Sequence, residues 1–318
     1  MKKILITGSN GFIGKHLVAR IANEYDIYCL TSDLRNHNQV RLEVQQILPD
    51  LTVHLAARTE VERSFYEQTT FCDINYTGTV NLIESLVATC KSPKILFAST
   101  MEVYGWQPVS DQIEQGHVPA ELPVFDPDHT VPNPNAPYAV AKLACEKYIE
   151  YAHRCFGLDY INIRQTNSYG RDDNNFFVTE QIISQMLKNP DACKLGYKNP
   201  YRNFIFIDDL IDAWVTLIDK FDQVANNNFT VGPNNPIKIQ DYTHLIAKKL
   251  NWQGTIEWDT KPARPGEIYL LNSSEQKIHL HTGWSPKISL DQGLDRTIEI
   301  WKNKMTREID VIRQQEGW

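Results

Sequence analysis

The stretch Lys3-Ile4-Leu5-Ile6-Thr7-Gly8-Ser9-Asn10-Gly11-Phe12-Ile13-Gly14 decides the fold. Its first half is a β-rich apolar run, and the apolar residues after the glycines recur at helical spacing. The order is therefore strand, tight glycine turn and helix. Such a turn brings the backbone close to a pyrophosphate and directs the free N–H groups of the helix at the phosphate charge.

Three glycines in this turn have separate reasons to lack a side chain. A Cβ at Gly8, Gly11 or Gly14 would block the turn, the phosphate approach or the packing of helix on strand. We predict a dinucleotide site at the first strand of the chain. Its predicted residues in this stretch are Gly8, Asn10, Gly11, Phe12, Ile13 and Gly14.

A second pattern predicts proton transfer. Tyr138 and Lys142 lie four residues apart just after Pro137, which favours a helix start, so both side chains share one helical face. A neighbouring ammonium and an oxidised nicotinamide would lower the pKa of the phenol from about 10 and make it a base near neutral pH. Thr100 ends the predicted strand 94–99, at the edge where ligands bind, and could hold the substrate oxygen.

The arrangement along the chain predicts an α/β fold, with a doubly wound parallel (Rossmann) sheet. Strand-like runs at 2–7, 26–30, 52–56, 94–99 and 160–164 alternate with helical patterns. We expect a dinucleotide-binding domain over 1–170, with elements near 204–233 returning to it, and a smaller, mainly substrate-binding region over 171–318. Within these, 204–207 and 229–231 read as strands that rejoin the sheet, and 107–137 reads as a long surface loop near the site.

Composition limits the possible partners. The chain has 318 residues, 42% hydrophobic content and a net charge of −7, which disfavours nucleic acid. No apolar run approaches a membrane-spanning length. Six cysteines lack any Cys-x-x-Cys spacing and read as reduced thiols, so we expect a cytoplasmic protein, with no membrane contact and no metal site.

These motifs resemble the extended short-chain dehydrogenase/reductase family, in particular its nucleotide-sugar epimerases, dehydratases and 4-keto reductases. The likeness covers nearly the whole chain. Beyond the stretches above it is carried by His54-Leu55-Ala56-Ala57, Asn75-Tyr76-Thr77-Gly78-Thr79, Arg164-Gln165-Thr166-Asn167-Ser168-Tyr169-Gly170, Arg202 to Asp209, Arg264-Pro265-Gly266-Glu267 and Gly283-Trp284-Ser285-Pro286-Lys287.

The resemblance implies roles for further residues. It places Leu55, Ala56, Ala57, Asn75, Tyr138, Lys142 and Gln165 at the cofactor, and Thr100, Met101, Asn167, Arg202 and Arg264 at a nucleoside-diphosphate sugar. Guanidinium groups suit phosphate oxygens. A salt bridge to Asp208 or Asp209 is the alternative for Arg202. The family also implies a homodimer through helices near 75–90 and 138–155, although their apolar positions equally suit burial against the sheet.

The choice of cofactor depends on Asp33. It lies nineteen residues after Gly14, where an acid contacts the adenine ribose and favours NAD. The segment between the second and third strands is short, however, so Asp33-Leu34 could instead match the family's adenine-contacting pair. Thr31, Ser32 and Arg35 would then accept the 2′-phosphate of NADP. We favour NAD and leave NADP open.

The reaction depends on Thr100-Met101-Glu102. Family 4,6-dehydratases commonly carry Thr-Asp-Glu, whose Glu removes the C5 proton and whose Asp protonates the leaving C6 hydroxyl. Met101 cannot donate a proton, so Glu102 would act alone. Thr100, Glu102, Tyr138 and Lys142 are the predicted catalytic residues. A 4,6-dehydratase or epimerase with internal hydride return leads, ahead of an NADPH-dependent 4-keto-6-deoxy-sugar reductase and a non-catalytic NAD(P)-binding subunit.

Overall fold

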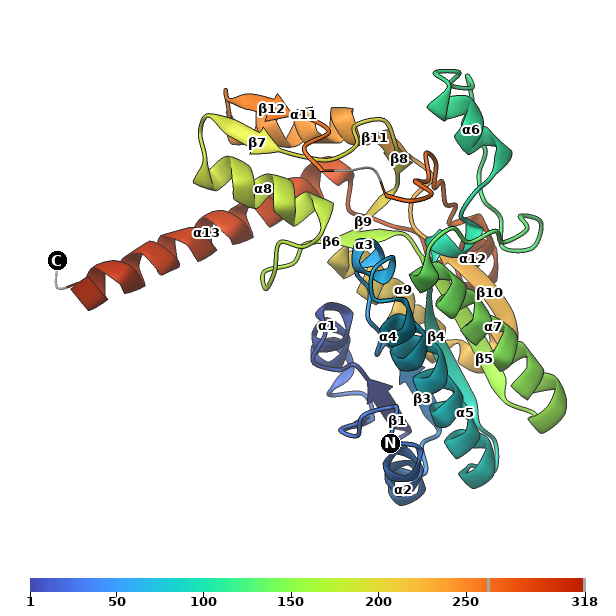
Figure 1. Cartoon of the computed structure of the whole chain (residues 1–318). Helices are drawn as coiled ribbons and strands as arrows, with labels where there is room; N and C mark the ends of the chain where they lie inside the picture. Colours follow the sequence, from blue (N-terminus) through green and yellow to red (C-terminus); the bar gives the residue numbers. More distant parts are fainter. Residues whose placement is uncertain (262–263, 317–318) are drawn as a thin grey trace.

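The sheet that organises the molecule has six parallel strands. The structure, a computed structural model, describes residues 1–261 and 264–316, and side chains as far as Arg307. The strand order is β10-β5-β4-β3-β1-β2 (Figure 1). The bounds are β1 (Lys3–Thr7), β2 (Asp26–Cys29), β3 (Leu51–His54), β4 (Lys94–Thr100), β5 (Asp159–Gln165) and β10 (Asn227–Val231). The five strand-like runs read from the sequence thus all become strands of one parallel sheet.

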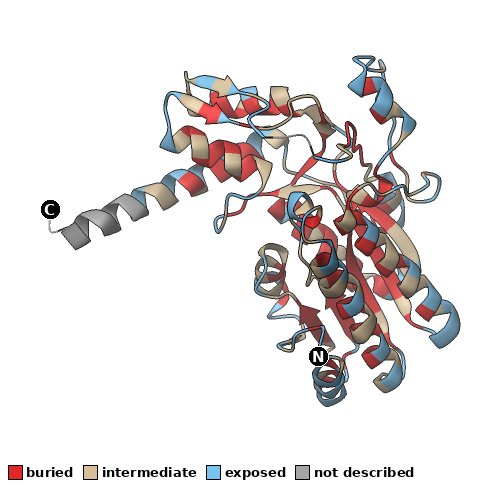
Figure 2. Cartoon of the chain, in the orientation of Figure 1, coloured by how far each residue is buried: buried red, intermediate tan, exposed pale blue. Residues whose placement is uncertain are grey.

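Helices cover both faces of this sheet. Ile4 and Ile6 of β1 face the cluster that holds α1 (Phe12–Ile21) and α9 (Ile207–Asp219), whereas Leu5 faces α2 (His37–Ile47), α5 (Gly78–Thr89) and α7 (Pro137–Phe156). Alternate residues of a strand point to opposite faces. Burial is concentrated in the strands and the inner helix faces (Figure 2). The doubly wound Rossmann architecture is confirmed.

The sheet ends at β2, because the chain runs from β2 through α2 directly into β3. Only one of the two segments expected to rejoin the sheet does so. β10 pairs with β5, but β9 (Phe204–Phe206) pairs with β6 (Asn167–Tyr169) in a separate two-stranded sheet. The expectation for 204–207 was wrong, since an apolar tripeptide does not encode which strand it pairs with.

The C-terminal elements gather beyond the carboxyl ends of the strands (Figure 1). Two further small sheets pair β7 (Ala192–Lys194) with β12 (Thr255–Glu257) and β8 (Tyr201–Arg202) with β11 (Ile237–Lys238). The helices here are α8 (Val178–Lys188), α11 (Ile239–Leu250) and α13 (Leu290–Glu316). The remaining short helices are α3 (Val61–Ser64), α4 (Gln68–Cys72), η1 (Asp73–Thr77), α10 (Phe221–Val224) and α12 (Gln276–Thr282).

The segment 107–137 is not only a loop, because it contains α6 (Pro108–Glu114). Its return is fixed to η2 (Met101–Tyr104), the 3₁₀ turn after β4. Gly105 has φ +51°, and a Cβ there would collide with the carbonyl of Asn133. The ring of Phe125 packs 5.6 Å from that of Tyr104. The segment is therefore held against the turn that carries the predicted catalytic residues.

Candidate active site

The glycine turn has the geometry that a bound pyrophosphate requires. Gly8 has φ +69°, and a Cβ on it would lie 2.7 Å from the nitrogen of Ala56. A Cβ on Gly14 would overlap the carbonyl oxygen of Gly8, so α1 packs directly on the turn. The helix starts at Phe12 with no acidic residue in its first turn and no side-chain cap. Its first N–H groups thus remain available to an anion.

A chain of hydrogen bonds fixes the next strand to this turn. Thr7 Oγ1 accepts from the Ala56 N–H at 3.1 Å and lies 2.6 Å from His54 Nδ1. His54 Nε2 lies 2.9 Å from Thr79 Oγ1, which donates to the Asn75 carbonyl at 2.5 Å. Burial, followed by the charge of Lys142, lowers the pKa of His54 to about 3. The imidazole is therefore neutral, and the network has one consistent direction.

Asn75 holds the loop after β3. Its side chain accepts from the N–H of Arg58 at 2.8 Å and donates to the carbonyl of Arg58 at 2.9 Å. Leu55, Ala56 and Ala57 form the first part of this loop, alongside Gly8. The structure thus gives Asn75 a loop-holding role, and its predicted contact with the cofactor stays a prediction.

Tyr138 and Lys142 lie on the first turns of α7, as the sequence predicts, and both side chains are buried. Lys142 Nζ donates to the carbonyl of Ala98 on β4 at 2.7 Å and lies over the ring of Phe97. Burial lowers the pKa of Lys142 to about 8. This bond ties the helix to the strand that ends in Thr100.

The Tyr138 hydroxyl lies near Thr100. Burial raises the pKa of Tyr138, while the hydroxyl of Thr100 acts to lower it and the charge of Glu102 raises it further. The net direction is opposite to the lowering expected from Lys142 and an oxidised nicotinamide, because burial of the phenol dominates here. The structure brings Thr100, Glu102 and Tyr138 together at the carboxyl end of β4.

Glu102 is partly accessible, not a fully solvated loop carboxylate. Its N–H donates to Thr100 Oγ1 at 3.2 Å. Burial raises the pKa of Glu102, and the nearby charges of Arg202 and Arg264 oppose that rise. A carboxyl group with a raised pKa can both accept and return a proton near neutral pH. Met101, in contrast, is buried among apolar side chains.

Arg202 has a different partner from the one considered in the sequence. Its guanidinium donates to Glu267 at 3.1 Å and to the carbonyl of Ile268 at 2.7 Å. The alternative prediction, a salt bridge from Arg202 to Asp208 or Asp209, was wrong. Asp209 instead accepts from the backbone of 287–288, and Asp208 pairs with Arg296. Arg264 is exposed and lies 4.0 Å from Glu267. Glu267 thus lies beside both arginines.

The remaining predicted residues border this region. The side-chain amide oxygen of Gln165 accepts from the indole N–H of Trp214 at 3.3 Å, and Gln165 pairs in register with Thr100. Asn167 lies on β6. Asp33 receives a bidentate contact from Arg35, which lowers the pKa of Asp33 to about 2. Leu34 is buried, and an added Cβ on Gly78 would meet its Cβ at 2.9 Å.

Sequence reasoning missed a buried network beneath the site. Glu146 pairs with Arg164 at 2.6 Å and accepts from the hydroxyl of Ser99. Arg164 also donates to the Tyr104 hydroxyl at 3.0 Å. The position of Glu146, four residues after Lys142 on the same helical face, is the signal that could have indicated it.

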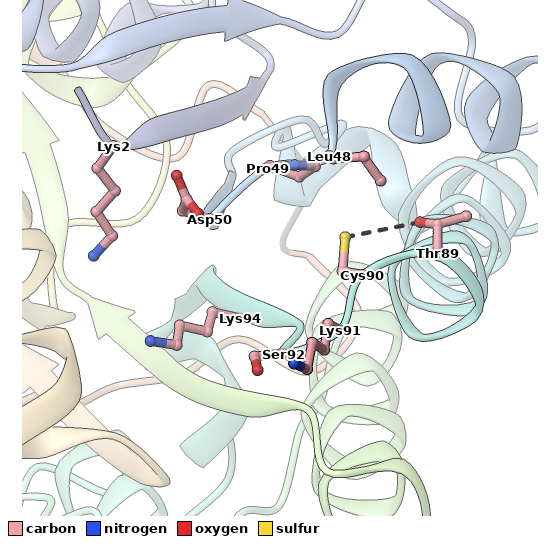
Figure 3. A pocket seen from close by; sticks show the side chains of 9 residues that line it. All are labelled: Lys2, Leu48, Pro49, Asp50, Thr89, Cys90, Lys91, Ser92 and Lys94. Carbon is pink, nitrogen blue, oxygen red and sulfur yellow. Dashed lines mark hydrogen bonds between the residues drawn. The ribbon is translucent and has the colours of Figure 1, made fainter.

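A hollow of about 670 Å³ lies at the amino ends of the strands, where β1, β3 and β4 begin (Figure 3). Lys2, Lys91 and Lys94 line it together with Asp50. Lys94 is already paired with Asp222 at 2.5 Å. The hollow is far along the strands from Thr100 and takes no part in the site.

The fold and the site define a class of protein. A parallel Rossmann sheet, a glycine turn and a buried Tyr-x-x-x-Lys pair beside a threonine are those of an extended short-chain dehydrogenase/reductase. The chain belongs to the NAD dependent epimerase/dehydratase family, whose model matches residues 4–232.

Full-length relatives carry several activities. The chain is 29% identical to a putative UDP-glucose 4-epimerase of Methanocaldococcus jannaschii, covering 94% of this chain and 98% of that protein. It is 27% identical to the GDP-6-deoxy-D-mannose reductase of Pseudomonas aeruginosa, covering 96% and 99%. It is 25% identical to the dTDP-D-glucose 4,6-dehydratase of Mus musculus, covering 95% and 89%.

Solved structures agree on the fold. The UDP-glucose 4-epimerase of Thermotoga maritima, solved with UDP-glucose, superposes with a TM-score of 0.82 at 24% identity, covering 95% of this chain and 99% of that one. RMD from Pseudomonas aeruginosa, solved with NADPH, gives 0.81 at 26% identity, covering 96% and 100%. Relatives thus act on nucleotide sugars, and NAD(P) is the cofactor class.

Two negative findings concern the described part of the chain. Within residues 1–261 and 264–316, no helix is both long and apolar enough to cross a membrane. Among the side chains that the structure describes, no group of three His, Cys, Asp or Glu residues is arranged to hold a metal ion.

Proposed function

We propose that the chain is an NAD-dependent enzyme that modifies a nucleoside-diphosphate hexose through hydride transfer at sugar C4, as a 4,6-dehydratase or an epimerase with internal hydride return. The observation that supports it most is that Thr100, Glu102 and Tyr138 converge at the carboxyl end of β4, on the same edge of the sheet as the glycine turn after β1 and with β3 between the two strands. The dinucleotide, when bound, accepts and returns the hydride. The proposal assigns dinucleotide binding to residues 1–170 and the sugar nucleotide mainly to residues 171–318.

The protein residues have separate tasks. Tyr138 takes the proton of the C4 hydroxyl, and Thr100 orients that oxygen through its own hydroxyl. Lys142 holds β4 and α7 together at Ala98 and supplies a positive charge. Glu102 removes the C5 proton of the 4-keto sugar, and the same carboxyl group then protonates the leaving C6 hydroxyl, which departs as water. In an epimerase Glu102 has no such step.

Arg202 and Arg264 supply the positive charge for the diphosphate. They lie near Glu102, and Glu267 orients both guanidinium groups from one side. An arginine held in place by a carboxylate loses less freedom when it binds a phosphate. Asn167 and Met101 complete the proposed substrate contacts, and Gln165 the nicotinamide contact.

A second candidate function is an NADPH-dependent 4-keto-6-deoxy-sugar reductase. The observation in its favour is the short connection between β2, the edge strand of the sheet, and β3. α2 alone separates β2 from β3, and this is the short connection that in the sequence left NADP, the cofactor of such a reductase, open. The full-length likeness to a GDP-6-deoxy-D-mannose reductase agrees with it.

Mass spectrometry of the products separates these functions. Purified protein is incubated with nucleoside-diphosphate hexoses and UDP-glucuronate, with catalytic NAD and no reductant. A product lighter by one water supports the dehydratase, and an isomer of unchanged mass resolved by chromatography supports the epimerase. No turnover until a 4-keto sugar and NADPH are supplied replaces both with the reductase.

We also propose a homodimer through α5 and α7. Ile83, Leu86, Ile149 and Ala152 are buried within the chain itself, so they pack against the sheet. α7 nevertheless exposes Val140, Tyr151 and Phe156, with 49%, 42% and 54% of their surface accessible. Sedimentation should give twice the chain mass, and Tyr151→Glu should shift it toward that of one chain.

A further inference from the structure

An internal carboxylate occupies the end of β2. Glu43 of α2 accepts from the N–H and hydroxyl of Thr31 at 2.8 and 3.1 Å. Its second oxygen accepts from the N–H and hydroxyl of Ser32 at 3.1 and 2.6 Å. Burial opposes ionisation, but the bonds from Ser32 and Thr31 lower the pKa of Glu43. The carboxylate is thus charged, and its four acceptor positions are filled.

In Rossmann folds the residues that follow β2 distinguish NAD from NADP. Cys29 pairs with Ile6, and the Leu30 N–H donates to the Ile6 carbonyl at 2.9 Å, so residues 31–32 lie next to the glycine turn. In such folds an acid here binds the ribose 2′-hydroxyl of NAD, and polar or basic groups accept the 2′-phosphate of NADP. Two backbone amides and two hydroxyls that converge on one point form a phosphate-binding nest.

The neighbouring cation is also paired. Arg35 makes a bidentate contact with Asp33, at 3.0 and 2.6 Å, and lies 3.9 Å from Asp73. Thr31, Ser32 and Arg35, the three residues predicted to accept a 2′-phosphate, are therefore all bonded to carboxylates already. The net charge around this end of β2 is negative, which disfavours a phosphate that carries nearly two further negative charges.

We propose that Glu43 is the residue that determines cofactor preference: it fills the nest of Thr31 and Ser32, excludes the 2′-phosphate and makes the site selective for NAD. The inference rests on the proposed dinucleotide site and deepens it. A 2′-phosphate would have to break four hydrogen bonds of an ionised carboxylate and then lie beside its charge. Without that carboxylate the same four donors would face the phosphate.

Equilibrium binding of NAD and NADP, measured by titration calorimetry without substrate, tests this. The wild type should bind NAD more tightly by about tenfold or more. Glu43→Ala should narrow or reverse that ratio by about tenfold, mainly through tighter NADP binding. Glu43→Gln, which keeps the shape and removes the charge, is the second variant should the alanine protein melt early.

Two controls localise the effect. Glu24→Ala removes the same charge from an exposed position before β2 and should leave the ratio at its wild-type value. Ser32→Ala added to Glu43→Ala should cancel the gain in NADP affinity, since it removes a donor of the nest. A wild type that prefers NADP, or a ratio unchanged in both Glu43 variants, would overturn the inference. A wild type that binds neither dinucleotide would overturn the proposed function itself.

Discussion

The carboxylate of Glu146 and the guanidinium of Arg164 lie 2.6 Å apart in the interior, with side-chain exposures of 0% and 3%. The pair joins α7, which carries Tyr138 and Lys142, to β5. Ser99, which donates to the same carboxylate, precedes Thr100 on β4. One buried ion pair therefore connects β5 to α7 and β4, the two elements that hold Tyr138, Lys142 and Thr100.

Glu146→Gln should lower the free energy of unfolding by about 3–5 kcal/mol, because it leaves the Arg164 charge buried without a counter-charge. Urea denaturation measures this change. The exposed pair of Arg20 and Glu24 is the matched control, and Glu24→Gln should cost less than about 1 kcal/mol. Equal costs for the two variants would show that burial of the pair is not what makes it matter.

Gly14→Ala should destabilise the protein and weaken dinucleotide binding together. The new methyl group would overlap the carbonyl of Gly8, and overpacking of this kind costs about 1–3 kcal/mol. Gly196→Ala, where a Cβ meets open space, is the control and should be neutral. Thermal melting with and without NAD measures both effects. A Gly14→Ala protein with wild-type melting temperature would contradict the packing argument.

Local signals explain why part of this structure could be read from the sequence. The glycine turn and the Tyr138–Lys142 spacing are fixed by neighbouring residues, so both were placed correctly on their elements. The pairing of β9 with β6 and of Arg202 with Glu267 depends on residues far apart in the chain, and no local pattern encodes it. Glu43 was missed because Thr31 and Ser32 precede it by 12 and 11 residues, and no local pattern shows that the helix returns Glu43 to them.

Tyr138→Phe should reduce the rate of hydride transfer by about 10²–10⁴-fold, because the proposed mechanism gives the C4 hydroxyl proton to the phenol. The substitution removes only the phenolic hydroxyl, which lies near Thr100, and keeps the buried ring. Binding of NAD should therefore be unchanged. Single-turnover absorbance at the reduced nicotinamide measures the rate, and calorimetry the binding. Loss of NAD binding instead would make Tyr138 a structural residue.

Acid should destabilise the protein partly through His54. In the fold burial holds the pKa of His54 at about 3, whereas in the unfolded chain it is 6.5. Between these values the unfolded state binds more protons, so stability is full above about pH 6.5 and falls as the pH decreases. At pH 5 the loss from this one group is about 2 kcal/mol.

His54→Gln should flatten this dependence, although its absolute stability is lower because the bonds to Thr7 and Thr79 change. Urea denaturation at pH 7.5 and pH 5 provides the comparison. His117→Gln, at an exposed position, should retain the wild-type difference between the two pH values. The assignment to His54 fails should both variants show the same pH dependence.

Glu102→Gln separates the two internal-hydride reactions. In a dehydratase the variant should lose water elimination by at least about 10²-fold while oxidation at C4 continues, because the carboxylate acts only after the 4-keto sugar has formed.

Burial raises the pKa of Glu102, so the wild-type rate of elimination should fall on the acid side at a pH above the usual carboxyl range. That acidic limb should be absent from the residual activity of the variant. An epimerase, which needs no base at C5, should keep its rate and show no such limb in either protein. Product mass and a pH–rate profile for both proteins therefore decide whether Glu102 moves a proton of the sugar or only contributes its charge beside Arg202 and Arg264.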